Sequence, residues 1–364
     1  MHRSLYAAWA LAFCASSADA FMPASSAVPA LRAKTATAMA GRMGSKIHAP
    51  GCSCVSCGAC VLGRKGASKL SMTAADTTEF VGKGMDSQTY AEALNTLFPG
   101  AVDEQTFIDS MSRVLYDKGF NPDSAINLVS TCRDEICRPF TEKLDSKWGE
   151  HFSISSLGGM VFCGTTGFGA GMAHSPQVGG KERYAFWAGP HIAFGTAGEV
   201  GQIYRAGREG ISNACGALIA LNGQIASGKL NTELNPLDTE MSLLRQSVLS
   251  KLSYGQQPNL VGITYAAHDV IKEQVELTAE KAASKDASEY VIISGVQIHG
   301  ALGYNYWWPG SITHYANGVA TDLNADYEKA ISYYNIVDFI NNKALEHAQQ
   351  SAGMRLPSIA ADVV

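Results

Sequence analysis

Long hydrophobic runs, repeats and clustered positive charge are all missing from the main part of this 364-residue chain. The apolar run at residues 5–15 is shorter than the roughly 20 apolar residues of a transmembrane helix, and no other segment approaches that length. We therefore do not expect an integral membrane protein. Residues 73–364 contain 20 Lys or Arg against 32 Asp or Glu. Nucleic acid, which is bound by clustered basic residues, is thus not an expected partner.

Cysteine is also scarce in the main part of the chain. Beyond residue 72 there are four, Cys132, Cys137, Cys163 and Cys215. So few cysteines do not make a disulfide scaffold, and metal-binding or catalytic roles are favoured instead. The composition, 46 % hydrophobic and 17 % charged residues, is typical of a globular protein with one large domain or two small ones.

A glycine-rich stretch at residues 158–171 lacks the order of a nucleotide-binding loop. It has neither the lysine of a phosphate-binding loop nor the glycine spacing of a dinucleotide-binding fold. We interpret it as a loop whose glycines let the backbone approach a packed site closely. His174, just after this stretch, is either a proton relay, since histidine titrates near neutral pH, or a structural residue.

The first 72 residues differ from the rest and predict a two-part leader. A basic start, a short apolar run and small residues up to position 20 are typical of a secretory signal. Residues 21–72 contain no Asp or Glu and are typical of a transit peptide. This order, with Phe21 at the junction, resembles the presequences of algae with secondary plastids, such as diatoms. The resemblance implies a plastid protein of the stroma, pyrenoid or thylakoid lumen, with a signal peptide at residues 1–20, a transit segment at 21–72 and one folded domain at 73–364.

Four further cysteines, Cys52, Cys54, Cys57 and Cys60, lie close together inside this leader. Their spacing suits zinc or an iron–sulfur cluster. The alternative is that they belong to a targeting segment that is removed, in which case they carry no information about the fold.

Strands separated by helices predict an α/β fold with a mainly parallel sheet flanked by helices. Strands are expected at residues 125–131, 151–155, 184–187 and 290–296, and a hairpin at 192–204. Helices are expected at residues 103–119, 140–148, 212–225, 238–252, 267–284 and 326–350. Residues 305–318, which include Trp307, Trp308 and His314, are interpreted as an aromatic loop.

Cys132, His191 and Cys215 are the strongest candidates for metal binding. Cys132 follows a predicted strand, His191 follows Gly189-Pro190, and Cys215 falls in the first turn of a predicted helix, where a thiolate is favoured. Two thiolates and an imidazole are three zinc ligands, and catalytic zinc sites keep their fourth position for water. The alternative is that the cysteines are small buried hydrophobic residues and His191 is a core histidine.

Three motifs in this order resemble the limiting-CO2-inducible B/C family, which includes the theta-class carbonic anhydrases of diatoms: CRDEICR at residues 132–138, GPH at 189–191 and REGISNACG at 208–216. The resemblance covers most of residues 81–350. It implies a fold similar to that of beta-class carbonic anhydrases, a homodimer, and Zn2+ held by Cys132, His191 and Cys215. It also implies that Asp134 and Arg138 pair near the metal. The spacings differ from the beta-class motifs, so that kinship is structural.

With this resemblance, the chain is expected to be a zinc carbonic anhydrase that interconverts CO2 and bicarbonate. In this hypothesis Arg138 holds Asp134, which accepts a hydrogen bond from the attacking hydroxide; the alternative is an inconsequential surface ion pair. Two other functions stay open. One is a non-catalytic protein that binds zinc or bicarbonate in a CO2-concentrating assembly, and the other is a hydrolase with Cys132 or Cys215 as nucleophile and His191 as base. Residues expected to serve the core, the structure or an interface are Cys137, Cys163, His299 and His314.

Overall fold

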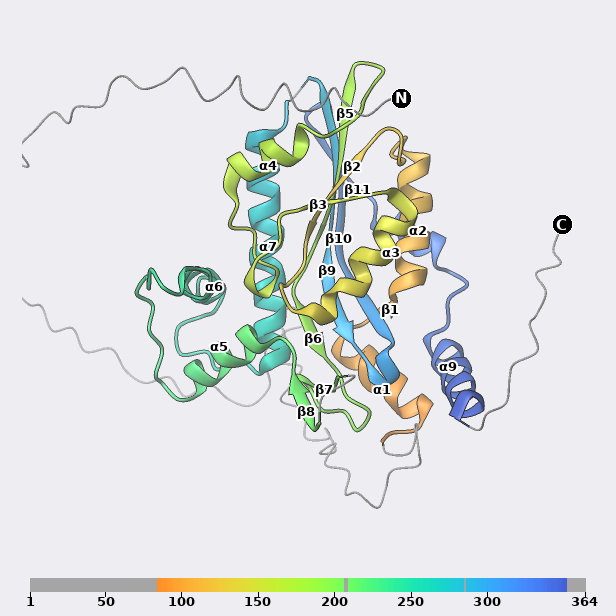
Figure 1. Ribbon diagram of the computed structural model, residues 1–364, viewed down its shortest axis with the longest axis vertical. Helices are drawn as coiled ribbons and strands as arrows, with labels where there is room; N and C mark the ends of the chain where they lie inside the picture. Colours follow the sequence, from red (N-terminus) through yellow and green to blue (C-terminus); the bar gives the residue numbers. More distant parts are fainter. Residues whose placement is uncertain (1–83, 206–208, 285, 352–364) are drawn as a thin grey trace, which may run out of the picture. The chain divides into compact units, whose positions relative to one another are not determined.

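The computed structural model of the protein describes residues 84–205, 209–284 and 286–351 (Figure 1). All of them belong to one unit, Gly66–Val364. The predicted signal peptide, the transit segment, the cysteine cluster at 52–60 and Arg208 of the third motif lie outside the described residues. Among the described helices, none is long and apolar enough to span a bilayer.

The described strands form a mixed sheet with a parallel centre. Its main path runs β1, β10, β9, β5, β2, β3, with β11 beside β10, β4 beside β5 and β6 beside β9. Strands β9, β5, β2 and β3 are parallel, whereas β10 is antiparallel to β9. A separate pair joins β7 to β8. The bounds are β1 Val102–Asp103, β2 Ile126–Ser130, β3 Phe152–Ser153, β4 Gln177–Val178, β5 Lys181–Ala188, β6 His191–Ala193, β7 Gln202–Tyr204, β8 Ile211–Asn213, β9 Ser288–His299, β10 Asn305–Ala316 and β11 Val319–Asp322.

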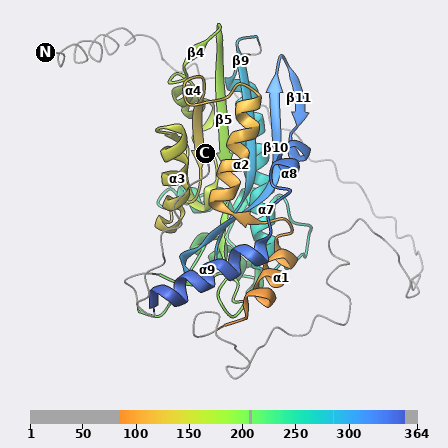
Figure 2. The same ribbon diagram turned by 90° about the vertical axis from the view of Figure 1, so that its right-hand side faces the viewer.

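Helices cover both faces of this sheet. Figure 1 shows α4, α5, α6 and α7 on one side and α2, α3 and α9 on the other, and Figure 2 looks onto the second side, where α8 lies beside α2. The α/β class predicted from the sequence is confirmed. The bounds are α1 Ser87–Leu97, α2 Glu104–Asp117, α3 Arg138–Trp148, α4 Gly164–Met172, α5 Gly216–Ala226, α6 Thr239–Leu249, α7 Leu260–Ala282, α8 Asn324–Ala330 and α9 Ile336–Ser351.

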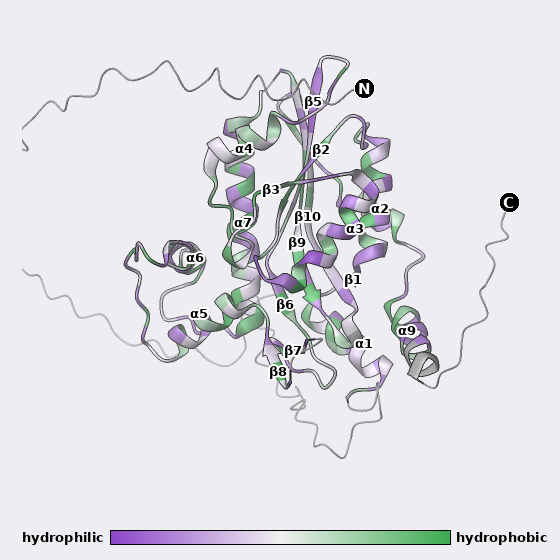
Figure 3. Ribbon diagram, viewed as in Figure 1, coloured by the Kyte–Doolittle hydropathy of each residue, from purple (hydrophilic) through white to green (hydrophobic). Residues whose placement is uncertain are grey.

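The central strands contribute side chains to two hydrophobic cores, one on each face of the sheet. In β5, Tyr184 and Phe186 belong to the core beneath α4 and α7, whereas Ala185 and Trp187 belong to the core beneath α2 and α3. This alternation follows from the two-residue period of a strand. Because both faces are buried, the central strands are hydrophobic almost throughout, which Figure 3 shows as green along the middle of the sheet.

Most of the predicted elements are present close to their expected bounds. The helix expected at 103–119 is α2, whose first turn is capped by the side chain of Asp103, which accepts from Thr106 N at 3.0 Å. The strand expected at 125–131 is β2, and the helix at 140–148 is α3, with Pro139 in its first turn. Strand β9 is longer than the predicted 290–296.

The aromatic segment at residues 305–318 is a strand, not the loop we expected. β10 pairs with β9 over most of its length, and the pairing shifts register between Pro309 and Ser311. A proline cannot donate a ladder hydrogen bond and is tolerated at a bulge. The register shift thus accommodates Pro309 and Gly310, the two residues that favoured a loop, within the strand.

The glycine-rich stretch also differs from expectation, because part of it is helix α4. A Cβ on Gly171 would lie 2.7 Å from Phe152 Cδ1 and 2.8 Å from Leu128 Cδ2. Glycine therefore lets α4 pack closely on the sheet, and this packing outweighs the poor helix propensity of glycine.

The predicted bounds of three elements were wrong. Residues 212–225 do not form one helix: Ile211–Asn213 pair with β7 as β8, so α5 starts at Gly216 and Cys215 is its N-cap rather than a helical residue. The terminal helix is broken between α8 and α9, where the Asn335 side chain accepts from Val337 N at 2.9 Å. The expected hairpin is reduced to a bridge between Phe194 and Val200, because His191–Ala193 pair with β9.

Candidate metal centre

The three predicted ligands come from three segments near the carboxyl ends of the parallel strands. Cys132 follows β2, His191 begins β6, and Cys215 caps α5. β5 and β6 are separated by Gly189-Pro190, and a Cβ on Gly189 would lie only 2.0 Å from Gly295 O. Glycine there allows the chain to run closely alongside β9, with which β5 and β6 both pair, and to place His191 near the two cysteines. Ligand sites of open α/β sheets lie at this edge.

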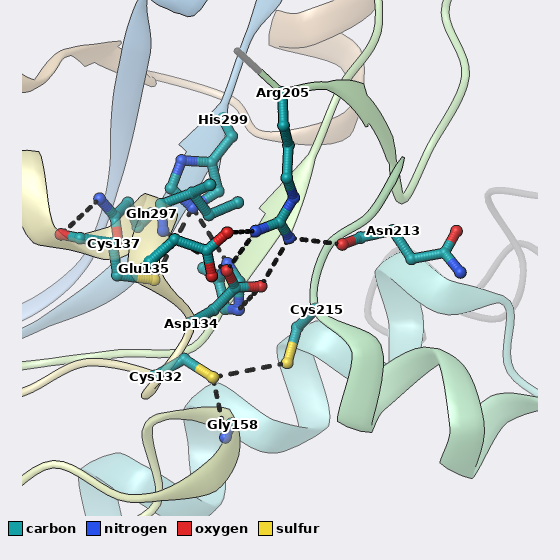
Figure 4. A network of polar contacts seen from close by, with 12 residues as sticks. Cys132, Asp134, Glu135, Cys137, Gly158, Arg205, Asn213, Cys215, Gln297 and His299 are labelled. Carbon is teal, nitrogen blue, oxygen red and sulfur yellow. Dashed lines mark hydrogen bonds and ion pairs between the residues drawn. The ribbon is translucent and has the colours of Figure 1, made fainter. Parts of the chain in front are cut away.

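The structure brings Cys132, His191 and Cys215 together in a buried cluster, and Figure 4 shows how the two cysteines of this cluster face each other. Their candidate ligand atoms lie within 4.8 Å of one another, and the two sulfur atoms are 3.8 Å apart. The backbone N–H of Gly158 donates to Cys132 Sγ at 3.2 Å. Gly158 has φ +70°, a conformation that favours glycine. This donor stabilises negative charge on the Cys132 sulfur.

The two thiols influence each other's ionisation. Contact with Cys215 is the main cause that lowers the pKa of Cys132, with His191 adding to it. Conversely, contact with Cys132 and then burial raise the pKa of Cys215 well above that of an ordinary thiol. Two sulfur atoms this close favour a shared proton when no cation is near. A divalent cation between them would favour both thiolates.

The imidazole of His191 has one nitrogen engaged and one free. Nδ1 is 3.0 Å from His299 Nε2, whereas Nε2 is buried and makes no hydrogen bond to any described group. A buried polar atom without a partner is costly unless something binds it. The free nitrogen and the two sulfur atoms are the donor types that zinc prefers, so these residues fit a zinc ion.

A carboxylate borders the same cluster. Asp134 Oδ2 lies 3.9 Å from His191 Nε2. Arg205 holds both oxygens of Asp134, with Nη1 2.7 Å from Oδ1 and Nη2 2.9 Å from Oδ2. Burial raises the pKa of Asp134, but the hydrogen bonds from Arg205 lead the causes that oppose this rise, and the pKa is lowered to about 2. Asp134 is therefore a carboxylate throughout the physiological pH range.

The predicted pair of Asp134 and Arg138 is wrong. Arg138 is 77 % exposed and pairs with Glu142 at 2.7 Å, one turn along α3. Asp134 is instead the N-cap of a short 3-10 helix and faces away from that helix surface toward Arg205. Arg205 lies just after β7, and its Nη2 also donates to Asn213 O at 2.8 Å. The spacing of four residues suggested Arg138, but the fold supplies the arginine from 71 positions away.

Two further residues beside the cluster were expected to be structural or core residues. His299 and Cys137 are buried, with Cys137 Sγ 3.8 Å from His299 Nε2, and with His191 they form a second group of possible ligands. Burial is the main cause that lowers the pKa of His299 to about 3, so its ring is neutral. The other candidates are elsewhere in the fold: Cys163 is exposed before α4, and the ring of His174 lies against Phe152.

Comparison with known proteins identifies the family of the chain that carries this cluster. Residues 101–316, more than half of the chain, match the family model described as limiting CO2-inducible proteins B/C beta carbonic anhydrases. The chain belongs to this family. The matched range contains all three possible ligands together with Asp134 and Arg205. The family resemblance expected from the three sequence motifs is thereby confirmed.

Solved structures of this family have the same fold. The crystal structure of limiting CO2-inducible protein LCIB is 29 % identical, with a TM-score of 0.54, and the match covers 64 % of this chain and 97 % of that one. The crystal structure of PtLCIB4, a homolog of LCIB, is 21 % identical with a TM-score of 0.56, covering 64 % and 98 %. At that identity the second likeness shows the fold alone. A comparison with curated protein sequences found no match.

Proposed function

We propose that this chain is a zinc-dependent carbonic anhydrase that interconverts CO2 and bicarbonate. The observation that carries the proposal is the meeting of two buried thiols and a free buried imidazole nitrogen beside an arginine-held carboxylate. Family membership supports the activity. As part of the same proposal, the chain works in a plastid as a homodimer; this part rests on the leader sequence and on the family resemblance.

Cys132, His191 and Cys215 would hold the zinc. When bound, zinc acidifies water and so supplies a nucleophile near neutral pH. The protein keeps the ligands in place before the metal arrives: Gly158 N–H donates to Cys132, and His299 engages the far side of His191. Three protein ligands leave one coordination position for the reaction.

Asp134 would orient the nucleophile. As a carboxylate it can only accept hydrogen bonds, and each oxygen has acceptor capacity beyond the bond from Arg205. An O–H group beside Asp134 and His191 would donate to Asp134 and turn its oxygen lone pair toward CO2. Arg205 fixes the carboxylate in this direction and is therefore a positioning residue.

Separate substitution of Arg205 and of Arg138 gives a direct test of which arginine holds Asp134. Arg205→Met should reduce CO2 hydration by about 10–100-fold, the usual cost of losing a supporting partner, with zinc still bound. Arg138→Met should change the rate less than about twofold, because exposed ion pairs contribute little. Stopped-flow CO2 hydration and zinc content of both variants decide the matter. The reverse order of effects would reject Arg205 as the residue that holds Asp134.

The proposal as a whole is tested on the purified chain by its zinc content and by stopped-flow CO2 hydration. We expect about one zinc per chain and CO2 hydration that a chelator abolishes and added zinc restores. One zinc without hydration would instead support a non-catalytic zinc or bicarbonate protein. Absence of zinc, with a reactive Cys132, would support the cysteine hydrolase, which the lowered pKa of Cys132 favours.

A further inference from the structure

The Nδ1 nitrogen of His191 belongs to a buried series of hydrogen-bonded side chains that has no role in the proposed reaction. Behind His191 lie His299, the last residue of β9, and Asn305, the first residue of β10. These two residues are paired across the strands, and His299 Nδ1 lies 3.1 Å from Asn305 Oδ1. Asn305 also lies within hydrogen-bonding reach of Glu104, the first residue of α2. Two side chains, those of Asn305 and His299, thus connect a buried carboxyl group to a candidate zinc ligand.

The carboxyl group of Glu104 accepts hydrogen bonds on both of its oxygens. Its side chain is fully buried, yet Lys143 Nζ lies 2.7 Å from Oε2 and Gln297 Nε2 lies 2.7 Å from Oε1. Both partners are donors, and Lys143 is charged. Burial raises the pKa of Glu104, and the charge and hydrogen bond of Lys143 are the main causes that oppose this rise and favour the ionised form. A buried carboxylate is tolerated when it is paired in this way and its other oxygen is also hydrogen-bonded.

An acceptor at one end of the chain sets the direction of every hydrogen bond that follows. A carboxylate can only accept, so Asn305 presents its NH2 group to Glu104 and its carbonyl oxygen to His299. His299 must then carry its proton on Nδ1 and donate it to Asn305. Its Nε2 is left as an acceptor for His191 Nδ1–H, 3.0 Å away. The result is a lone pair on His191 Nε2, the nitrogen that faces the thiols and has no described hydrogen-bond partner.

We propose that Glu104, acting through Asn305 and His299, fixes the tautomer of His191 so that its Nε2 is permanently ready to bind the metal. The inference rests on the proposed function, since it treats His191 as a zinc ligand, and it deepens that function by assigning three positioning residues. The partner on the far nitrogen of a metal-binding histidine determines ring orientation and basicity. Here that partner is a second histidine, whose own tautomer is determined by a remote carboxylate.

The tautomers can be observed without any assay of activity. We expect nitrogen-15 NMR spectra of the zinc-loaded full chain, labelled at histidine, to show His299 protonated on Nδ1 and unprotonated on Nε2. The His299→Gln spectrum identifies which signals belong to His299. In zinc-free protein His191 should likewise carry its proton on Nδ1. A proton on Nε2 of either ring would overturn the inference, even in a chain that binds zinc and hydrates CO2.

Zinc affinity gives an independent readout. His299→Leu and Asn305→Leu should each weaken zinc binding by about 10–100-fold in a chelator competition. His299→Gln should bind zinc within about threefold of the natural chain, because its amide oxygen can still accept from His191 Nδ1–H. His268→Leu is the matched control, since His268 is equally buried but bonds Ser294 away from this chain of side chains.

These outcomes separate the inference from the proposed function. Unchanged zinc affinity in folded His299→Leu would reject the positioning role, and a second zinc ion per natural chain that is lost in Cys137→Ser would make Cys137 and His299 ligands of a second metal instead. A natural chain that binds no zinc would reject the proposed function, whatever the tautomers are. If His299→Leu fails to fold, the NMR measurement on the natural chain still decides.

Discussion

Replacing Asp134 with alanine is expected to lower kcat/KM for CO2 hydration by about 10²–10⁴-fold, the range attributed to a positioned acid or base group. Zinc content should stay unchanged, because the three ligands do not include Asp134. The loss should appear at all pH values near neutrality, since Arg205 keeps the pKa of Asp134 at about 2 and the group does not titrate there. The measurement is stopped-flow hydration at several pH values with zinc analysis of each sample.

Glu135→Gln is the control that matches this variant. Glu135 also pairs with Arg205, but its side chain is 73 % exposed, so its contribution should be small and the rate should fall by less than about threefold. If Asp134→Ala keeps the natural rate, Asp134 does not orient the nucleophile. If it loses zinc as well, Asp134 stabilises the metal rather than the reaction.

Replacing Cys215 with serine is expected to remove both the metal and the activity. A hydroxyl is a much poorer zinc ligand than a thiolate, and only Cys132 and His191 would remain in this cluster. Zinc should fall from about one per chain to nearly none, and CO2 hydration should become indistinguishable from the uncatalysed rate. Zinc analysis after desalting, followed by stopped-flow measurement, checks both effects.

Cys163→Ser is the corresponding control, because Cys163 is exposed, precedes α4 and belongs to neither ligand group. It should bind zinc and hydrate CO2 as the natural chain does. Zinc retained by Cys215→Ser would show that the metal is held by other residues. Cys137, His191 and His299 would then be the first candidates.

The residues that meet at the metal centre were accessible from the sequence because each stands in a distinctive local setting. Cys132 follows a hydrophobic strand, and His191 follows Gly189-Pro190. Parallel strands bring their carboxyl ends to one edge, so residues after two such strands are brought together. Cys215 was also identified, although the helix that it caps starts later than expected because β8 takes the residues before it.

The residues that complete the centre were not accessible in the same way. Arg205 stands in the short segment after β7, and nothing in its local sequence links it to Asp134, 71 positions earlier. The family resemblance implies Arg138, four positions after Asp134, but its side chain is exposed and pairs with Glu142. The sequence predicts only a core or interface role for His299, because the feature that identifies it is its strand pairing with Asn305. Such contacts arise from tertiary packing, which local patterns do not encode.

The two misassigned segments have the same explanation. Pro309 and Gly310 are typical of a loop, but β9 offers a partner strand and the pair is accommodated in one bulge. Glycines along 164–171 disfavour a helix in isolation, but Gly171 allows α4 to pack against Phe152 and Leu128. In both segments a long-range partner outweighs the local preference.

The separation of the ligands along the chain has a consequence for the order of assembly. Cys132 and Cys215 stand 83 positions apart, and His191 lies between them on a different strand. These three residues therefore form no compact chelating motif in an unfolded chain, and a metal held by them binds the folded state almost exclusively. At a free concentration of 100 times its dissociation constant, such a metal would stabilise the fold by about 2.7 kcal/mol. Metal binding should therefore occur late in folding, after the sheet has formed, and should then stabilise the folded state.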